Sequence, residues 1–254
     1  MITSRANPQV KYVRRLQSDR RYRAAERVFV VEGTRWLRDL AAAGVRPRAL
    51  FATDAWLSSN EGRALATRLG AAVPVTEDVL VAMSDTESAP GVLAVVEYNP
   101  APWPAAPTFL LILDAVSNPG NLGTILRSAS AAGAEGVLLG PGCVDATNPK
   151  VVRGSMGAIL RLPLRAADWP EIAQSAAGLD VWLAAARDGL AYSNVDWRRP
   201  AALLIGGEAH GAGAAAERLA TGRVTIPMRD ATESLNAAVA AGVILFEVAR
   251  QRQE

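Results

Sequence analysis

Three groups of polar residues in the second half of the chain each follow an apolar run that predicts a β-strand. The motif N-x-G-x-x-x-R spans 121–127, G-G-E spans 206–208, and I-P-M at 226–228 precedes S-L-N at 234–236. Ligands of open α/β sheets bind beyond the carboxyl ends of the strands, so we expect the three groups to meet. Glycine leaves the backbone accessible, and the polar side chains could orient a ligand and stabilise charge. These candidate side chains are Asn121, Arg127, Glu208, Ser234 and Asn236.

Each candidate also has a simpler structural interpretation. Arg127 could be a surface residue on a helix predicted over 122–132, and Ser234 could merely cap a helix predicted over 234–250. Asn236 falls inside that apolar helix, where a buried amide needs hydrogen-bond partners. The single histidine, His210, is predicted to be a solvated loop residue.

Other common catalytic sites are missing from the sequence. No phosphate-binding loop for a nucleoside triphosphate and no dinucleotide fingerprint occurs, which counts against a nucleotide-dependent small-molecule enzyme. No serine–histidine–aspartate arrangement is recognisable. With one cysteine, Cys143, and one histidine, neither an internal disulfide nor a metal site is expected. A reducing, cytoplasmic setting fits, and no apolar run is long enough to predict a membrane span.

The charge of the chain is unevenly distributed although the net charge is only +2. Residues 1–50 hold twelve Lys or Arg against four Asp or Glu, whereas the remaining residues hold 15 against 21. Almost all of the basic excess is arginine, whose planar fork suits phosphate. The pattern favours contact with nucleic acid, although a solvated helix face or an arginine-rich genome would also explain it. The candidate RNA contacts are Arg14, Arg15, Arg20, Arg21 and Arg23.

Strands and helices alternate along the whole chain, which predicts an α/β protein with two domains. The first domain, 1–98, is expected to be a small α/β sandwich. Residues 99–107 hold four prolines and predict a stiff linker. The second domain, 108–254, begins with the apolar strand 109–114 and predicts a mostly parallel sheet. A helix is also predicted over 150–160.

The three motifs, in this order and spacing, resemble those of the SpoU/TrmH branch of the SPOUT methyltransferases. The stretch 150–158, which reads K-V-V-R-G-S-M-G-A, is similar to a conserved segment of that family. The segments SRANPQVKYVRRL and FVVEGTRWLRDL resemble its N-terminal substrate-binding domain, which is similar to the ribosomal protein L30e fold. The resemblance covers nearly the whole chain.

The resemblance implies an S-adenosyl-methionine-dependent RNA ribose 2′-O-methyltransferase without a metal. It also implies a deep C-terminal trefoil knot and a homodimer with the active site near the subunit interface. The donor is expected to contact the backbone at Gly206, Ile226 and Leu235. The family's catalytic arginine falls on Arg127, and its other site residues fall on Asn121, Glu208, Ser234 and Asn236. One departure is the charged segment 229–233, where family members often have small residues.

The resemblance also implies large-subunit ribosomal RNA as the most fitting substrate, because relatives with an L30e-like front domain mostly act on it. Two alternatives stay open: a tRNA 2′-O-methyltransferase, and a non-catalytic RNA-binding protein of the same fold. Neither the target nucleotide nor the final proton acceptor is predicted.

Overall fold

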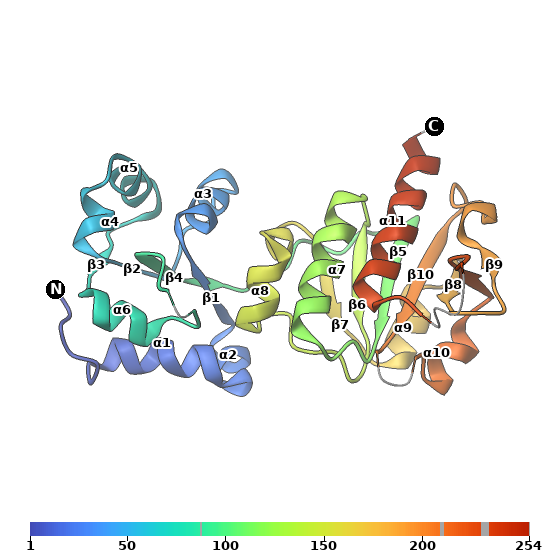
Figure 1. Ribbon diagram of the computed structural model, residues 1–254, viewed down its shortest axis with the longest axis horizontal. Coiled ribbons are helices and arrows are strands. Elements are labelled where there is room, and N and C mark those ends of the chain that lie inside the picture. The colour runs from blue at the N-terminus through green and yellow to red at the C-terminus, as the bar shows by residue number, and fades with distance from the viewer. Residues whose placement is uncertain (87, 209–210, 230–233, 254) are drawn as a thin grey trace. The chain divides into compact units, whose positions relative to one another are not determined.

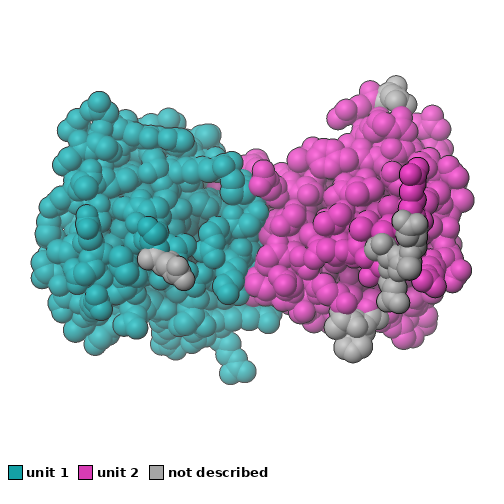
Figure 2. Space-filling model, viewed as in Figure 1, with its two compact units in different colours: residues 1–99, 147–157 teal, residues 100–146, 158–254 magenta. Residues whose placement is uncertain are grey.

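The computed structural model describes residues 1–86, 88–208, 211–229 and 234–253. The chain forms two compact units, one of residues 1–99 and 147–157 and the other of residues 100–146 and 158–254 (Figure 2). Each unit has its own β-sheet (Figure 1). The first unit therefore includes 147–157, which the sequence-based division assigns to the second domain. The separate roles assigned to the two domains stay predictions.

The first unit contains a mixed sheet in the order β1-β4-β2-β3. Its strands are β1 (Val28–Glu32), β2 (Ala49–Ala52), β3 (Val73–Pro74) and β4 (Val92–Glu97). Its helices are α1 (Pro8–Ser18), α2 (Arg20–Glu26), α3 (Thr34–Ala42), α4 (Asp54–Ser58), α5 (Asn60–Leu69), α6 (Glu77–Met83) and α8 (Pro149–Ser155). Strand β4 is antiparallel to β1 and β2, and β3 is parallel to β2.

Helices α1 and α6 bury their apolar faces in one core with the sheet. Val10, Val13 and Leu16 repeat at helical spacing along α1 and are fully buried in this cluster. Leu80 and Met83 contribute the α6 side. Asn7 caps α1, because its side chain accepts a 2.9 Å hydrogen bond from the Gln9 amide, and Pro8 is the first residue of the helix.

Helix α8 is shorter than the helix predicted over 150–160. It ends at Ser155 because Met156 and Gly157 adopt the left-handed conformation, with φ of 50° and 84°. A 3-10 turn follows at Ala158–Leu160. Val151 and Val152 are almost completely buried, and α8 contacts β1. Deleting residues 1–98 would therefore leave α8 without its packing partners.

The burial of Arg23 corrects its assignment as an RNA contact. Its side chain is only 3% exposed, and its guanidinium donates to the carbonyl oxygens of Leu16 at 2.7 Å and Gln17 at 3.2 Å. It also donates to the Thr147 hydroxyl at 3.4 Å. Arg23 thus ties α1, α2 and the start of α8 together, and it is not accessible to a phosphate. Arg14, Arg15, Arg20 and Arg21 are exposed.

The second unit contains a seven-stranded sheet in the order β7-β6-β5-β10-β8-β11-β9. Its strands are β5 (Phe109–Asp114), β6 (Gly136–Leu139), β7 (Leu164–Ala166), β8 (Asp180–Ala184), β9 (Leu190–Ala191), β10 (Ala201–Gly206) and β11 (Gly222–Thr225). Its helices are α7 (Pro119–Ala131), α9 (Trp169–Ser175), α10 (Ala214–Leu219) and α11 (Ala237–Gln253). Every pairing between these strands is parallel, which confirms the predicted α/β class.

Helix α7 begins three residues before its predicted start. Residues 119–121 form its first turn, because the Asn118 side chain caps the amides of Gly120 at 2.8 Å and Asn121 at 3.2 Å. Helix α7 contacts α11, and α11 also contacts β10 (Figure 1). These two helices and the central strands frame the site.

The proline-rich segment 99–107 has no helix or strand but is anchored to the second unit. The ring of Trp103 lies 4.7 Å from the Arg165 guanidinium carbon and packs on Gly136, where a Cβ would lie 2.8 Å from the ring. The segment thus packs on the second sheet.

None of the helices in the described residues is both long and apolar enough to cross a membrane.

Candidate functional site

A cavity of about 450 Å³ opens at the carboxyl ends of β8, β10 and β11, next to the start of α11. Parallel strands end at the same edge of a sheet, and the register pairs Gly206 at the end of β10 with Asp114 at the end of β5. The volume lies within the range of small-molecule sites. All three predicted donor contacts, Gly206, Ile226 and Leu235, line this cavity.

The walls of the cavity are mainly apolar. Ile205, Met228, Ala240 and Ile244 supply side chains, whereas the glycines at 206, 207 and 211 expose backbone. Among the described lining residues the one ionisable side chain is Glu208, which is exposed. An apolar cleft with few polar groups suits a ligand that combines a flat aromatic ring with a small polar part.

Close backbone contacts require glycine at the last residue of β10 and at the residue that follows it. A Cβ on Gly206 would lie 2.5 Å from the backbone of Gly211 and Ala212, and one on Gly207 would lie 2.4 Å from the Ala115 carbonyl oxygen. Gly207 and Gly211 also exchange two backbone hydrogen bonds of 3.1 and 3.0 Å. The two ends of this loop are therefore closed against each other, and no side chain fits between them.

The carboxylate of Asp114 binds the backbone just after Gly211, at Gly213. It is 5% exposed and accepts a 2.7 Å hydrogen bond from the Gly213 amide. Asp114 was not among the predicted site residues, although it is the polar residue that ends the apolar strand 109–114.

Three of the predicted site residues form one chain of hydrogen bonds. The Asn121 amide donates to Glu208 Oε1 at 2.7 Å, and Asn121 Oδ1 accepts from the Asn236 amide at 3.1 Å. An ionised Glu208 carboxylate accepts hydrogen bonds but donates none, so the NH₂ group of Asn121 must face Glu208. The Asn121 side-chain oxygen then faces Asn236. These hydrogen bonds connect the first turn of α7, the segment after β10 and the start of α11.

Asn236 is the N-cap of α11, which corrects the expectation that it lies buried within a helix. Its Oδ1 accepts from the amides of Ala238 at 2.9 Å and Val239 at 3.3 Å, and its side chain is exposed. Ser234, considered as the cap, precedes the helix and lines the cavity. One side chain therefore both starts α11 and positions Asn121.

Replacing Asn236 by Ala is expected to lower the free energy of unfolding by about 1 kcal/mol, because two backbone amides lose their acceptor. For a protein of this size that corresponds to a fall of roughly 2–4 °C in the unfolding temperature. Differential scanning calorimetry measures it. Ser234→Ala is the matched control and should leave the unfolding temperature unchanged; an equal fall in both variants would contradict the assignment of the cap.

Arg127 lies apart from the hydrogen-bonded chain. It is exposed on α7 and does not line the cavity. No carboxylate within the described ranges pairs with it, so its guanidinium is available to an anionic partner. The structure thus brings together four of the five predicted site residues and leaves the fifth open to solvent.

Some cavity residues were missed because their types carry no polar signal. Ala184, Ala185 and Ala186 line the cavity at the end of β8, and Ala237 lines it at the start of α11. Their only signal is position at a strand end or helix start. His210 lies outside the described residues. In the part of the chain that the structure describes, no group of three or more His, Cys, Asp or Glu could hold a metal ion.

Comparisons with known proteins identify the family. The model of the SpoU rRNA methylase family matches residues 108–246, and that of an MRM3-like substrate binding domain matches residues 7–94. The chain is 35% identical to an uncharacterised tRNA/rRNA methyltransferase of Synechocystis, covering 99% of this chain and 94% of the relative. It is 30% identical to the 23S rRNA (guanosine(2553)-2′-O)-methyltransferase RlmP of Bacillus subtilis, covering 97% and 98%.

Two solved structures match this protein over nearly its whole length. The crystal structure of an AdoMet-bound rRNA methyltransferase from Sinorhizobium meliloti matches with a TM-score of 0.86 at 30% identity, covering 98% of this chain and 97% of that one. The SpoU methyltransferase AviRb from Streptomyces viridochromogenes, in complex with AdoMet, matches with a TM-score of 0.87 at 30% identity, covering 97% and 98%. This chain therefore belongs to the SpoU rRNA methylase family.

Proposed function

We propose that this protein transfers a methyl group from S-adenosyl-methionine to a ribose 2′-hydroxyl of RNA, with 23S ribosomal RNA as the substrate. The observation that carries the proposal is the cavity at the strand ends, which all three predicted donor contacts line and which the chain Asn236–Asn121–Glu208 borders. Two relatives are named as 23S rRNA 2′-O-methyltransferases, RlmP and the enzyme of Streptomyces viridochromogenes that modifies uridine 2479.

The residues of the cavity fit the donor. Apolar walls from Ile205, Ile226 and Ile244 suit an adenine ring, and the exposed backbone of 206–207 can hydrogen-bond its polar edge. The donor supplies an electrophilic methyl group on a positively charged sulfur. The carboxylate of Glu208 at the mouth of the cavity adds favourable electrostatics for that charge.

Arg127 is assigned to the substrate. As a permanently charged guanidinium it cannot serve as a general base. It can hold the phosphate beside the target ribose and stabilise the negative charge that develops on the 2′-oxygen during attack. Asn121 and Asn236 would fix the loop geometry around the ribose, and Ser234 would contact donor or substrate at the cavity wall.

The position of Arg127 outside the cavity supports a site completed by a second copy of the chain. Helix α11 carries two exposed apolar side chains one heptad apart, Val239 at 52% and Phe246 at 54% exposure. A homodimer that covers this face would bury them and could bring Arg127 of one protomer to the cavity of the other.

A subunit-mixing experiment tests this arrangement. Arg127→Ala removes the guanidinium, and Ala240→Phe fills the cavity, so each homodimer is expected to be inactive. Random mixing makes half of the dimers heterodimers, with one intact site each if Arg127 acts across the interface, so about a quarter of wild-type activity should return. Methyl transfer to 23S rRNA measures it. If no activity returns although mixed dimers form, Arg127 acts within its own protomer.

The first unit is proposed to supply RNA affinity, because Arg14, Arg20 and Arg21 are exposed and have no carboxylate partner among the described residues, which favours phosphate contact. A cytoplasmic location and a knotted path of the C-terminal segment complete the proposal. Calorimetric titration with S-adenosyl-methionine separates the enzyme from a non-catalytic RNA-binding protein of the same fold, which would not bind the donor.

A further inference from the structure

Asp114 is a buried acidic residue at the end of strand β5, and it is not among the described residues that line the cavity. The strand register nevertheless places it beside Gly206, which ends β10 and does line the cavity. Burial of a carboxylate is unfavourable unless hydrogen bonds replace its lost contacts with water. A buried aspartate next to a binding cavity is therefore expected to have a specific role.

The hydrogen-bond partner of Asp114 lies on the segment by which the chain returns to β10. Asp114 Oδ2 accepts a 2.7 Å hydrogen bond from the Gly213 amide. The residues just before Gly213 pack on the strand end, because a Cβ on Gly206 would lie 2.5 Å from the Gly211 carbonyl carbon and the Ala212 nitrogen. Asp114 thus binds the same returning segment that packs directly on Gly206.

Ala115, the next residue, contacts the part of the chain that leaves β10. A Cβ on Gly207 would lie 2.4 Å from the Ala115 carbonyl oxygen, so this oxygen lies directly against the Gly207 backbone. Gly207 and Gly211 exchange two backbone hydrogen bonds, which join the leaving and the returning parts. Residues 114–115 therefore contact both parts.

The backbone of Ala115 is held in an unfavourable conformation. Its φ of 53° lies in the left-handed region, which alanine rarely adopts. Its amide donates to the Pro141 carbonyl oxygen at 3.2 Å, and a Cβ on Gly142 would lie 3.0 Å from the Ala115 Cβ. Such strain persists where surrounding contacts impose it, often next to functional sites. The backbone that carries the Asp114 side chain is therefore fixed.

The segments that Asp114 and Ala115 contact form one wall of the cavity. The lining residues on this wall are Gly206, Gly207, Glu208 and Gly211. The wall exposes backbone, so its shape depends on how the leaving and returning segments are held together. Without the hydrogen bond from Gly213, the returning segment would lose the side-chain contact that ties it to β5.

We propose that Asp114 is a positioning residue for S-adenosyl-methionine, because it holds Gly213 and thereby gives the backbone at 206–208 the shape that binds the donor. The inference rests on the proposed function and assigns a role to a residue outside the cavity. Asp114 acts through the backbone and does not contact the donor. It therefore contributes equally to binding of S-adenosyl-methionine and of the demethylated product S-adenosyl-homocysteine, which lacks the positive charge on sulfur.

The test is calorimetric titration of the full-length protein with each of these two ligands. Asp114→Ala should bind both about tenfold more weakly, the order of magnitude expected from loss of one buried acceptor. Asp114→Asn keeps an oxygen that can accept from Gly213 and should bind both as the wild type does. Wild-type affinity in Asp114→Ala would overturn the proposal. So would a loss in Asp114→Asn, which, if limited to S-adenosyl-methionine, would show that the negative charge acts on the sulfonium directly.

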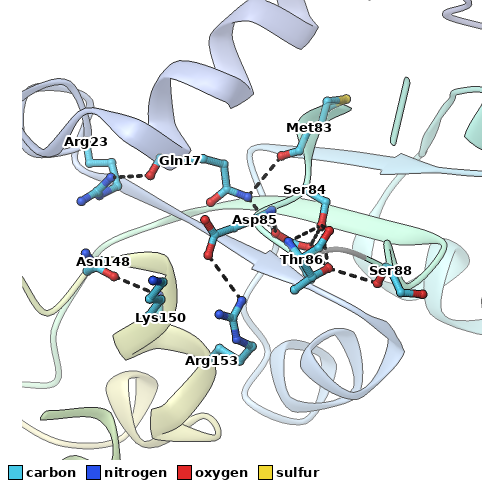
Figure 3. Close-up of polar contacts among 11 residues, drawn as sticks. Gln17, Arg23, Met83, Ser84, Asp85, Thr86, Ser88, Asn148, Lys150 and Arg153 are labelled. Atoms are coloured by element: carbon cyan, nitrogen blue, oxygen red, sulfur yellow. Dashed lines mark hydrogen bonds and ion pairs between the residues drawn. The ribbon is translucent and has the colours of Figure 1, made fainter. Parts of the chain in front are cut away.

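Glu32→Ala is the matched control for loss of a carboxylate that binds a backbone amide. Glu32 ends β1 as Asp114 ends β5, and it accepts from the Asp85 amide at 2.9 Å. Its network also includes Gln17 and Ser84 (Figure 3). The variant should unfold at a lower temperature but bind both ligands as the wild type does, because Glu32 belongs to the first unit. An equal loss of affinity in Glu32→Ala and Asp114→Ala would assign the effect to general destabilisation and contradict the proposal.

Hydrogen exchange tests the same bond without any substitution. The Gly213 amide should exchange slowly in the wild-type protein without donor, because its acceptor is a buried side chain. Exchange as fast as in an exposed loop would show that the bond does not form, and it would overturn the proposal even if Asp114→Ala failed to fold.

These results are distinguishable from failure of the proposed function. If the wild type transfers no methyl group to RNA, the proposed function fails whatever the variants bind. If the wild type transfers the methyl group and Asp114→Ala binds both ligands with wild-type affinity, only the role of Asp114 fails.

Discussion

Arg127→Ala is expected to reduce methyl transfer to 23S ribosomal RNA at least about a hundredfold, the usual effect of removing one preorganised donor to a developing oxyanion. Binding of S-adenosyl-methionine should be unchanged, because Arg127 does not line the cavity. The unfolding temperature should also stay constant, since the side chain is exposed and bonds no described residue. Single-turnover rates at saturating donor and RNA measure the chemical step.

Two control variants show whether the loss of activity is specific to the Arg127 guanidinium. Arg127→Lys keeps the charge but loses the planar fork, so it should recover only a small part of the rate. Arg218→Ala removes an exposed arginine from α10 in the same unit and should be as active as the wild type. Near wild-type transfer by Arg127→Ala would show that Arg127 does not contact the reacting groups.

Ala240→Phe is expected to weaken donor binding more than about a hundredfold. Ala240 lines the cavity in the first turn of α11, and a phenyl ring there occupies space that the donor needs. The fold should tolerate the change, because Phe lowers helix propensity by only about 0.5 kcal/mol relative to Ala and the ring can enter an existing cavity. Calorimetric titration with S-adenosyl-methionine gives the dissociation constant.

The control is Ala64→Phe, the same replacement at an exposed position of α5. It should bind the donor like the wild type and unfold at a similar temperature. Wild-type donor affinity in Ala240→Phe would place the donor outside this cavity and would contradict the site.

Regular elements with strong local signals were predicted well. The apolar strand 109–114 has the predicted bounds, because an uninterrupted apolar run is a local property of the sequence. Short edge elements such as β7 and β9 were missed, since two or three residues carry too little pattern. The start of α7 was misplaced because the cap by Asn118 competes with an equally plausible turn at the same Pro-Gly pair.

The contacts between the site residues could not be predicted from local sequence, because they are tertiary contacts. The motifs predicted that Asn121, Glu208 and Asn236 would meet, and hydrogen bonds connect them, although 115 residues separate the two asparagines. Burial is equally invisible in local sequence. Arg21 and Arg23 occur in one basic segment, yet Arg21 is exposed and Arg23 is packed against α1 and the residues before α8. Only the fold shows which arginine is exposed and could reach a phosphate, and which one is buried and connects helices.

The proposed methyl transfer is tested most directly by incubating the protein with S-adenosyl-methionine that carries a labelled methyl group and with 23S ribosomal RNA or tRNA. The RNA is then digested to nucleosides for mass spectrometry. We expect label in one 2′-O-methylated nucleoside from 23S RNA, little or none from tRNA, and none from either RNA with Ala240→Phe. Label on a base, or no label in the ribosomal RNA although the donor binds, would contradict it.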